Sequence, residues 1–133
     1  MRYMLLIYSQ ERAEAQLDPV ESQAIMKGHQ AVMEGTMKAG ILRAGEPLHP
    51  TSTATTVRRQ NGKPVTLDGP FAETKEQLGG YYILDCKDLD EAIHWASQIP
   101  TECKGGSGCI EIRPIMDIPK MVEEIEKAVA QAK

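Results

Sequence analysis

Histidine is the side chain best suited to move a proton near neutral pH, and His29 stands out among the three in this chain. Apolar residues around it recur at helical spacing. A step of about 100° per residue places His29 near the middle of the apolar face, with Ser22 almost directly above it. A buried imidazole needs a hydrogen-bond partner. Two interpretations follow: a core imidazole held by a carbonyl or hydroxyl, or a general base in a pocket between helix and sheet.

The other two histidines have weaker contexts. His94 lies opposite the apolar face of its predicted helix, where water would solvate it. His49 lies in a predicted loop before Pro50, and nothing local indicates a role for it.

A short segment between residues 68 and 75 combines opposite charges, a turn and the lone phenylalanine of the chain. Such a loop is either a binding loop or a solvated connection whose phenylalanine fills the core. Its candidate binding residues are Asp68, Phe71, Glu73 and Lys75.

Arginines on predicted strands offer a possible anion site. Arg58, Arg59 and Arg113 fall on strands, and Glu111 shares a face with Arg113. An exposed strand arginine usually forms an ion pair of little energetic value. If a second sheet covers that face, the arginine must be paired and becomes a natural anion clamp.

The cysteines indicate neither a metal site nor a nucleophile. Cys86, Cys103 and Cys109 are odd in number, form no C-x-x-C motif and have no histidine at zinc-ligand spacing. The glycine-rich stretch at 104–108 resembles part of a phosphate loop, but it leads into a strand rather than a helix. We therefore expect no metal, a reducing compartment and a cytoplasmic protein.

Length and charge favour one globular domain. The chain has 133 residues, 41% of them hydrophobic, and a formal net charge of −4. A chain of this length can bury enough apolar surface to fold without a disulfide or a metal ion. An acidic chain without a basic patch argues against nucleic acid, and no segment is long and apolar enough for a membrane. We expect a single domain over 1–133, with a core over 1–116 and a terminal helix over 117–133.

Periodicity and turn residues predict the elements. Helix starts are signalled by Asp18-Pro19-Val20-Glu21 and by Asp88 with Glu91, while Gly40 and Pro100 mark helix ends. The pair Asn61-Gly62 suits a type I′ hairpin turn. The predicted strands cover 2–8, 41–46, 55–67 (a hairpin), 81–86 and 109–116; the predicted helices cover 19–39, 89–99 and 118–131, with one further turn within 68–80.

Without the hairpin the order is β-α-β-β-α-β, the ferredoxin-like α+β pattern. Two helices cover only one face of such a sheet, yet the strand over 2–8 is apolar on both sides. The second face must be covered either by the terminal helix or by a second copy. We favour a homodimer that packs sheet to sheet.

Four strings resemble the DGPF family of YCII-related proteins: AGEPLHPTSTATTVR, DGPFAETKEQLGGYYILD, LDEAIHWA and EIRP, within roughly residues 1–118. The motif that gives the family its name stands at Asp68-Gly69-Pro70-Phe71. The resemblance implies a ferredoxin-like fold whose sheets pair in a dimeric α/β barrel.

The resemblance also suggests chemistry. YCII domains are associated with acid-base reactions of a pocket histidine paired with an aspartate, and one branch with dehydrochlorination of a chlorinated hydroxyquinol. His29 stands at the matching place, whereas Lys38 stands where the aspartate is expected. A carboxylate would then come from Asp68, Glu46 or Glu73. Genes of the DGPF family often neighbour those of extracytoplasmic-function sigma factors.

We therefore hypothesise a small-molecule-binding protein, a cofactor-independent lyase or isomerase. His29 would act as acid and base, with Asp68 or Glu46 orienting it. Arg113 and Tyr81 would position a small polar or anionic aromatic substrate. The alternative is a non-catalytic module that senses a ligand or binds a sigma factor through the helix over 118–131.

Overall fold

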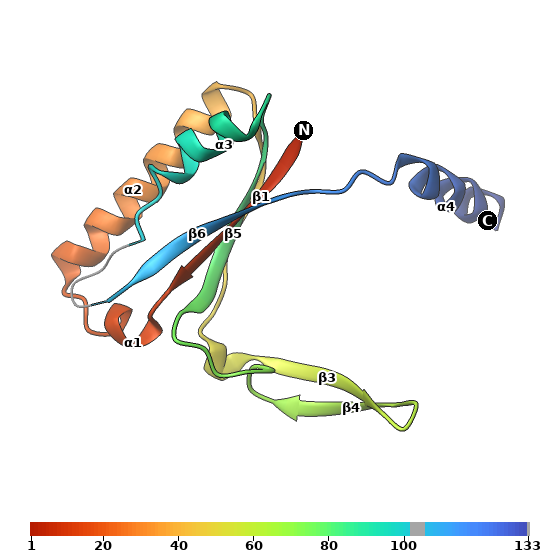
Figure 1. Cartoon of the computed structure of the whole chain (residues 1–133), viewed down its shortest axis with the longest axis horizontal. Coiled ribbons are helices and arrows are strands. Elements are labelled where there is room, and N and C mark those ends of the chain that lie inside the picture. The colour runs from red at the N-terminus through yellow and green to blue at the C-terminus, as the bar shows by residue number, and fades with distance from the viewer. Residues whose placement is uncertain (102–105, 133) are drawn as a thin grey trace.

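A computed structural model of the chain describes residues 1–101 and 106–132 (Figure 1). The fold is α+β, as predicted. Its strands are β1 (Arg2–Ser9), β2 (Leu42–Pro47), β3 (Thr55–Gln60), β4 (Lys63–Asp68), β5 (Gln77–Asp85) and β6 (Gly108–Pro114). Its helices are α1 (Glu11–Glu14), α2 (Pro19–Lys38), α3 (Leu89–Ala96) and α4 (Pro119–Gln131), with a short 3₁₀ turn η1 (Thr51–Thr53).

The main sheet has the ferredoxin-like arrangement that the sequence predicts. Its order is β2-β5-β1-β6 and every neighbouring pair is antiparallel. Helices α2 and α3 lie side by side on one face of the sheet (Figure 1). The predicted caps form, since Asp18 accepts a hydrogen bond from the Glu21 amide (2.8 Å) and Asp88 one from the Glu91 amide (2.9 Å).

The hydrophobic core lies between this sheet and the two helices. Leu5 on β1 and Leu84 on β5 are fully buried, and α2 contributes Val32 and Thr36. The Thr36 hydroxyl donates to the Val32 carbonyl (2.8 Å), so this buried polar group is satisfied within its own helix. The core thus fixes α2, which carries His29, against β1 and β5.

The other face of the sheet has no helix on it. Met4, Leu6 and Tyr8 of β1 point to this side, because Leu5 and Ser9 between and after them are buried on the helix side. Glu111 lies on the same face and accepts a hydrogen bond from the Tyr8 hydroxyl (3.5 Å). We call this surface the helix-free face.

The terminal helix does not cover that face. In Figure 1, α4 stands away from the rest of the fold, and none of its residues is buried. One of the two predicted ways of covering the helix-free face is therefore absent in the single chain. The exposed apolar stripe of α4 consists of Ile118, Met121, Val122, Ile125 and Val129.

The inserted hairpin also projects from the sheet. Strands β3 and β4 pair only with each other and form a second, two-stranded sheet. Asn61 (φ 52°) and Gly62 (φ 78°) both have positive φ, as the predicted type I′ turn requires.

The region before β5 differs from the prediction. The segment 68–80 contains no helical turn; instead β5 begins at Gln77, before the glycine pair that we took as its boundary. Glycine suits position 80 within the strand, because the backbone of β2 lies so close that a Cβ there would be 2.8 Å from the Glu46 carbonyl oxygen. The one-turn helix α1 was not predicted either.

Two further predictions concern the cysteine and glycine-rich segment near residue 104 and the lack of a membrane-spanning helix. Cys103 and the first two residues of the stretch at 104–108 lie outside the described residues. Within the described ranges, no helix has the length and apolar content needed to cross a membrane.

Candidate functional site

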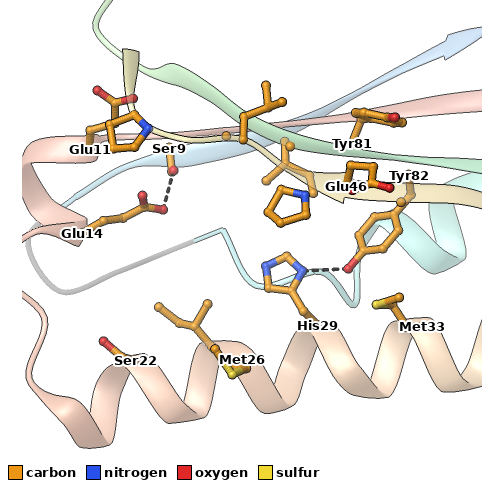
Figure 2. Close-up of a pocket in the computed structure, with 18 residues that line it drawn as sticks. Ser9, Glu11, Glu14, Ser22, Met26, His29, Met33, Glu46, Tyr81 and Tyr82 are labelled. Atoms are coloured by element: carbon orange, nitrogen blue, oxygen red, sulfur yellow. Dashed lines mark hydrogen bonds between the residues drawn. The ribbon is translucent and has the colours of Figure 1, made fainter. Parts of the chain in front are cut away.

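A cavity of about 400 Å³ lies between α2 and the sheet, in the range of small-molecule sites (Figure 2). Helix α2 forms one wall, β1, β2 and β5 form the opposite wall, and α1 with the segment before η1 closes one end. It is lined by Ile7, Ser9, Glu11, Glu14, Ser22, Ile25, Met26, His29, Met33, Gly45, Glu46, Pro47, Leu48, Pro50, Gly79, Gly80, Tyr81 and Tyr82.

His29 projects from α2 into this cavity and is paired with a tyrosine of the sheet. Its Nδ1 atom is 2.9 Å from the Tyr82 hydroxyl. The ring of Tyr82 lies over Gly45, where a Cβ would come within 2.7 Å of it. The absence of a side chain at Gly45 therefore lets the tyrosine reach His29.

The second ring nitrogen of His29, Nε2, points along the cavity toward the side of Ser9 and Glu14 (Figure 2). When the Tyr82 hydroxyl donates to Nδ1, Nε2 carries a proton and is a donor. When Nδ1–H donates to the tyrosine oxygen, Nε2 has a free lone pair and is a base. The pair thus supports both roles of an acid-base residue.

Burial sets the protonation of this pair. Desolvation lowers the pKa of His29 below its usual value, and the nearby charge of Glu14 partly opposes that shift. Burial likewise raises the pKa of Tyr82. At neutral pH His29 is therefore an uncharged imidazole and Tyr82 an uncharged phenol.

Two glutamates of α1 border the same cavity. Glu14 accepts a hydrogen bond from the buried Ser9 hydroxyl (2.6 Å). Glu11 accepts two from Thr51, one from its amide (2.8 Å) and one from its hydroxyl (2.7 Å). These bonds hold α1 against β1 and against η1, so they also shape the closed end of the cavity.

The structure brings some of the predicted site residues to His29. Ser22 and Glu46 both line the cavity, from α2 and β2 respectively. Tyr81 borders it, but its ring lies on the other side of the sheet from Tyr82 (Figure 2), as strand alternation requires.

Five other predicted residues do not line the cavity. Asp68, Phe71 and Glu73 are exposed near the base of the hairpin, and the Phe71 side chain is 75% exposed rather than in the core. Lys75 lines a separate pocket of about 350 Å³ together with Arg12.

Arg113 is on the helix-free face, because Ile112 beside it packs against the core. Within one chain, the proposed contact of Asp68 with His29 and the proposed role of Arg113 at the same cavity are therefore not found.

Sequence reasoning missed Tyr82, Ser9, Glu11 and Glu14. Strand alternation requires Tyr81 and Tyr82 to face opposite sides of the sheet, but it does not tell which of the two faces the helix. Glu11 and Glu14 belong to a single helical turn that leaves no periodic signal. Their approach to His29 depends on how α1 folds back, which no local pattern specifies.

The remaining candidates lie elsewhere. His94 is exposed and its Nε2 is 2.9 Å from the Gln98 amide nitrogen, away from the cavity lining. Cys86 is buried in the core, and burial raises the pKa of its thiol to about 11. Such a thiol is a poor nucleophile, as expected from its context.

Comparison with known proteins places this fold and cavity in a family. The family model described as "YCII-related domain" matches residues 1–119. The chain belongs to the YCII-related family. An uncharacterized protein of Rhizobium meliloti (strain 1021) is 37% identical over 115 residues, which span 86% of this chain and 92% of that protein.

The YCII-related match covers the sheet, α2, α3 and the whole cavity, and it ends where α4 begins. In this YCII-related chain the side chain that hydrogen-bonds to His29 is the phenol of Tyr82, where the resemblance implied an aspartate. Lys38 is the last residue of α2, nine positions beyond His29 and thus roughly 13 Å along the helix axis. A carboxylate at that position on the helix would not lie beside His29.

Proposed function

We propose that the cavity beside His29 binds a small polar or aromatic molecule and that His29 transfers a proton on it. The observation that carries this proposal is the position of His29. It is half-buried in a cavity of about 400 Å³, with one nitrogen held by Tyr82 and the other directed along the cavity.

The proposed reaction is an elimination or an isomerisation that needs no cofactor. Nε2 would remove a proton from a carbon acid while Nδ1–H donates to the Tyr82 oxygen. The imidazolium would then return the proton to another atom of the substrate or to a leaving group. A neutral histidine at working pH suits this role, because a base must be unprotonated to accept the proton.

Exchange of substrate protons with deuterated water tests this proposal without knowledge of the product. A panel of small polar and aromatic carbon acids is incubated with the protein in D₂O and followed by NMR. We expect exchange that falls about 100-fold or more in His29→Gln. The matched control, His94→Gln, changes an exposed histidine outside the cavity and should exchange as the wild type does. No exchange with any compound, or equal exchange by His29→Gln, would count against the proposal.

We also propose that two copies associate through the helix-free face. Partly exposed Met4, Leu6 and Tyr8 on the central strand support this, because apolar residues on both faces of a strand favour cover on both sides. Arg113 and Glu111 lie on the same face, so a second sheet over them would require their charges to be paired.

Sedimentation velocity tests this association. We expect a dimer for the wild type and a monomer for Leu6→Glu, which puts a charge into the centre of the helix-free face. Val57→Glu on the exposed hairpin is the control and should remain a dimer. Equal sedimentation of wild type and Leu6→Glu would contradict this interface.

A second candidate function rests on α4. The apolar stripe of this helix is exposed, and an isolated 13-residue helix is marginally stable in water. We infer as the alternative a non-catalytic module whose α4 binds an extracytoplasmic-function sigma factor encoded beside its gene, as the resemblance to the DGPF family suggests. Pull-down with that sigma factor should succeed with the full chain and fail with residues 1–116; no binding by either form would count against it.

A further inference from the structure

We infer that the ligand of the His29 cavity is a small organic cation with an apolar body, such as an arylalkylammonium ion, rather than an anion. The inference rests on the proposed binding function and refines it by naming the charge of the ligand. It also replaces the anionic aromatic substrate that the sequence suggested, because Arg113, which would have bound the anion, lies on the helix-free face.

The charge of the cavity lining carries the inference. Three carboxylates border the cavity: Glu11 and Glu14 at the α1 end, and Glu46 on β2. Among the residues that the structure describes, no lysine or arginine lines it. His29 adds no positive charge at neutral pH, because desolvation keeps it unprotonated. The cavity therefore has a negative potential that attracts cations and repels anions.

Within residues 1–101 and 106–132, no basic side chain forms an ion pair with these carboxylates. In the described part of the chain, the ion pairs involve Asp85, Asp117 and Glu123, and none of them includes a carboxylate of the cavity. The hydrogen bonds to Glu11 and to Glu14 come from uncharged groups, those of Thr51 and Ser9. Their negative charge is thus available to a ligand.

The rest of the lining fits an apolar body. Ile7 and Pro47 on the sheet side face Ile25, Met26 and Met33 on the helix side. Figure 2 shows Met26 and Met33 flanking His29 along α2, while Glu14 and Ser9 lie on the side toward which Nε2 points. A ligand whose ammonium group meets Glu14 would hold its apolar part against His29 and the methionines.

Matched probes of one shape test this inference. Benzylamine, benzyl alcohol and benzoate are titrated into the full-length protein at pH 7.5 and low salt, with binding followed by NMR of the His29 ring and the Met26 methyl group. We expect benzylamine to bind about tenfold more tightly than benzoate. Because the side chains of Glu14 and Glu46 are exposed to solvent, salt screens their charges and the preference should shrink at high salt.

Glu14→Gln is the decisive variant, because its amide oxygen can still accept the Ser9 hydrogen bond while the charge is lost. It should reduce the benzylamine preference several-fold, whereas Glu123→Gln on α4 should leave it unchanged. A second readout is the titration of His29, whose pKa a bound cation should lower further.

Three outcomes would overturn the inference: benzoate binding as tightly as benzylamine, no effect of Glu14→Gln, or no benzylamine signal at His29 at millimolar concentration. The proposed acid-base role fails separately, through deuterium exchange that does not depend on His29. A protein that prefers benzylamine but catalyses no exchange would keep the ligand class and lose the reaction.

Discussion

Nδ1 of His29 and the hydroxyl of Tyr82 lie 2.9 Å apart, although 53 residues separate them in the sequence. The tyrosine comes from the middle of β5 and is only 5% exposed, so the sheet fixes its position. The histidine sits on a helix whose other turns are anchored by Val32 and Thr36. The bond therefore orients the imidazole and decides which nitrogen faces the cavity.

Removing the tyrosine hydroxyl should weaken the action of His29 without unfolding the protein. For Tyr82→Phe we expect about tenfold slower deuterium exchange, since one hydrogen bond that orients the ring is lost. ¹⁵N NMR should show a changed population of the two His29 tautomers. Tyr3→Phe, a buried tyrosine outside the cavity lining, serves as the control and should show neither effect.

Stability should depend on pH through His29. The pKa of His29 is lower in the folded protein than the ordinary value of 6.5. As the pH falls below 6.5 the unfolded chain binds a proton that the folded chain does not, so stability is lost until the pH reaches the folded pKa. Urea unfolding at pH 7.5 and pH 5 should therefore show a larger loss for the wild type than for His29→Gln. An equal loss in both proteins would show that other groups set the pH dependence.

The contact between α2 and α3 should tolerate no added methyl group at Gly35. A Cβ there would lie 2.8 Å from the ring of Trp95. Gly35→Ala should destabilise the fold by about 1–3 kcal/mol, although alanine is the better helix former. In a Trp95→Ala background the same change should become neutral or stabilising. Denaturant unfolding of the four proteins of this cycle measures the coupling, and its absence would refute the contact.

Thiol labelling should distinguish the two cysteines that the structure describes. Cys86 is buried with a pKa raised to about 11, whereas Cys109 is exposed. In a Cys103→Ser variant at low protein concentration and pH 8, we expect one thiol to react with Ellman's reagent and the second only after unfolding. Labelling of Cys109 should slow as the protein concentration rises if the helix-free face is covered by a second copy. Fast native labelling of Cys86 would contradict the structure.

The sequence predicted the fold well because the fold follows from local signals. Capping residues at Asp18 and Asp88, the turn at Asn61-Gly62 and the apolar run of β1 each act over a few residues. His29 was singled out by helical spacing and by its match to the histidine of the family that the chain resembles. Its surroundings were not, because they depend on contacts between distant segments.

Asp68 illustrates that limit. A motif marks it clearly in the sequence, yet it ends the projecting hairpin and does not line the cavity. Glu14 has no motif and lies close enough to influence the charge of His29. The candidate site thus combines a helix position that periodicity reveals with residues of α1 that only the folding of distant segments brings near it.

The sheet order has a consequence for biosynthesis. Strand β1 lies at the centre of the sheet, and both of its neighbours, β5 and β6, come from the second half of the chain. During synthesis β1 therefore leaves the ribosome before either neighbour, and about a hundred further residues must be made before both β5 and β6 can pair with it. Until then its unpaired backbone and its apolar side chains are open to aggregation, the hazard against which chaperones protect a nascent chain.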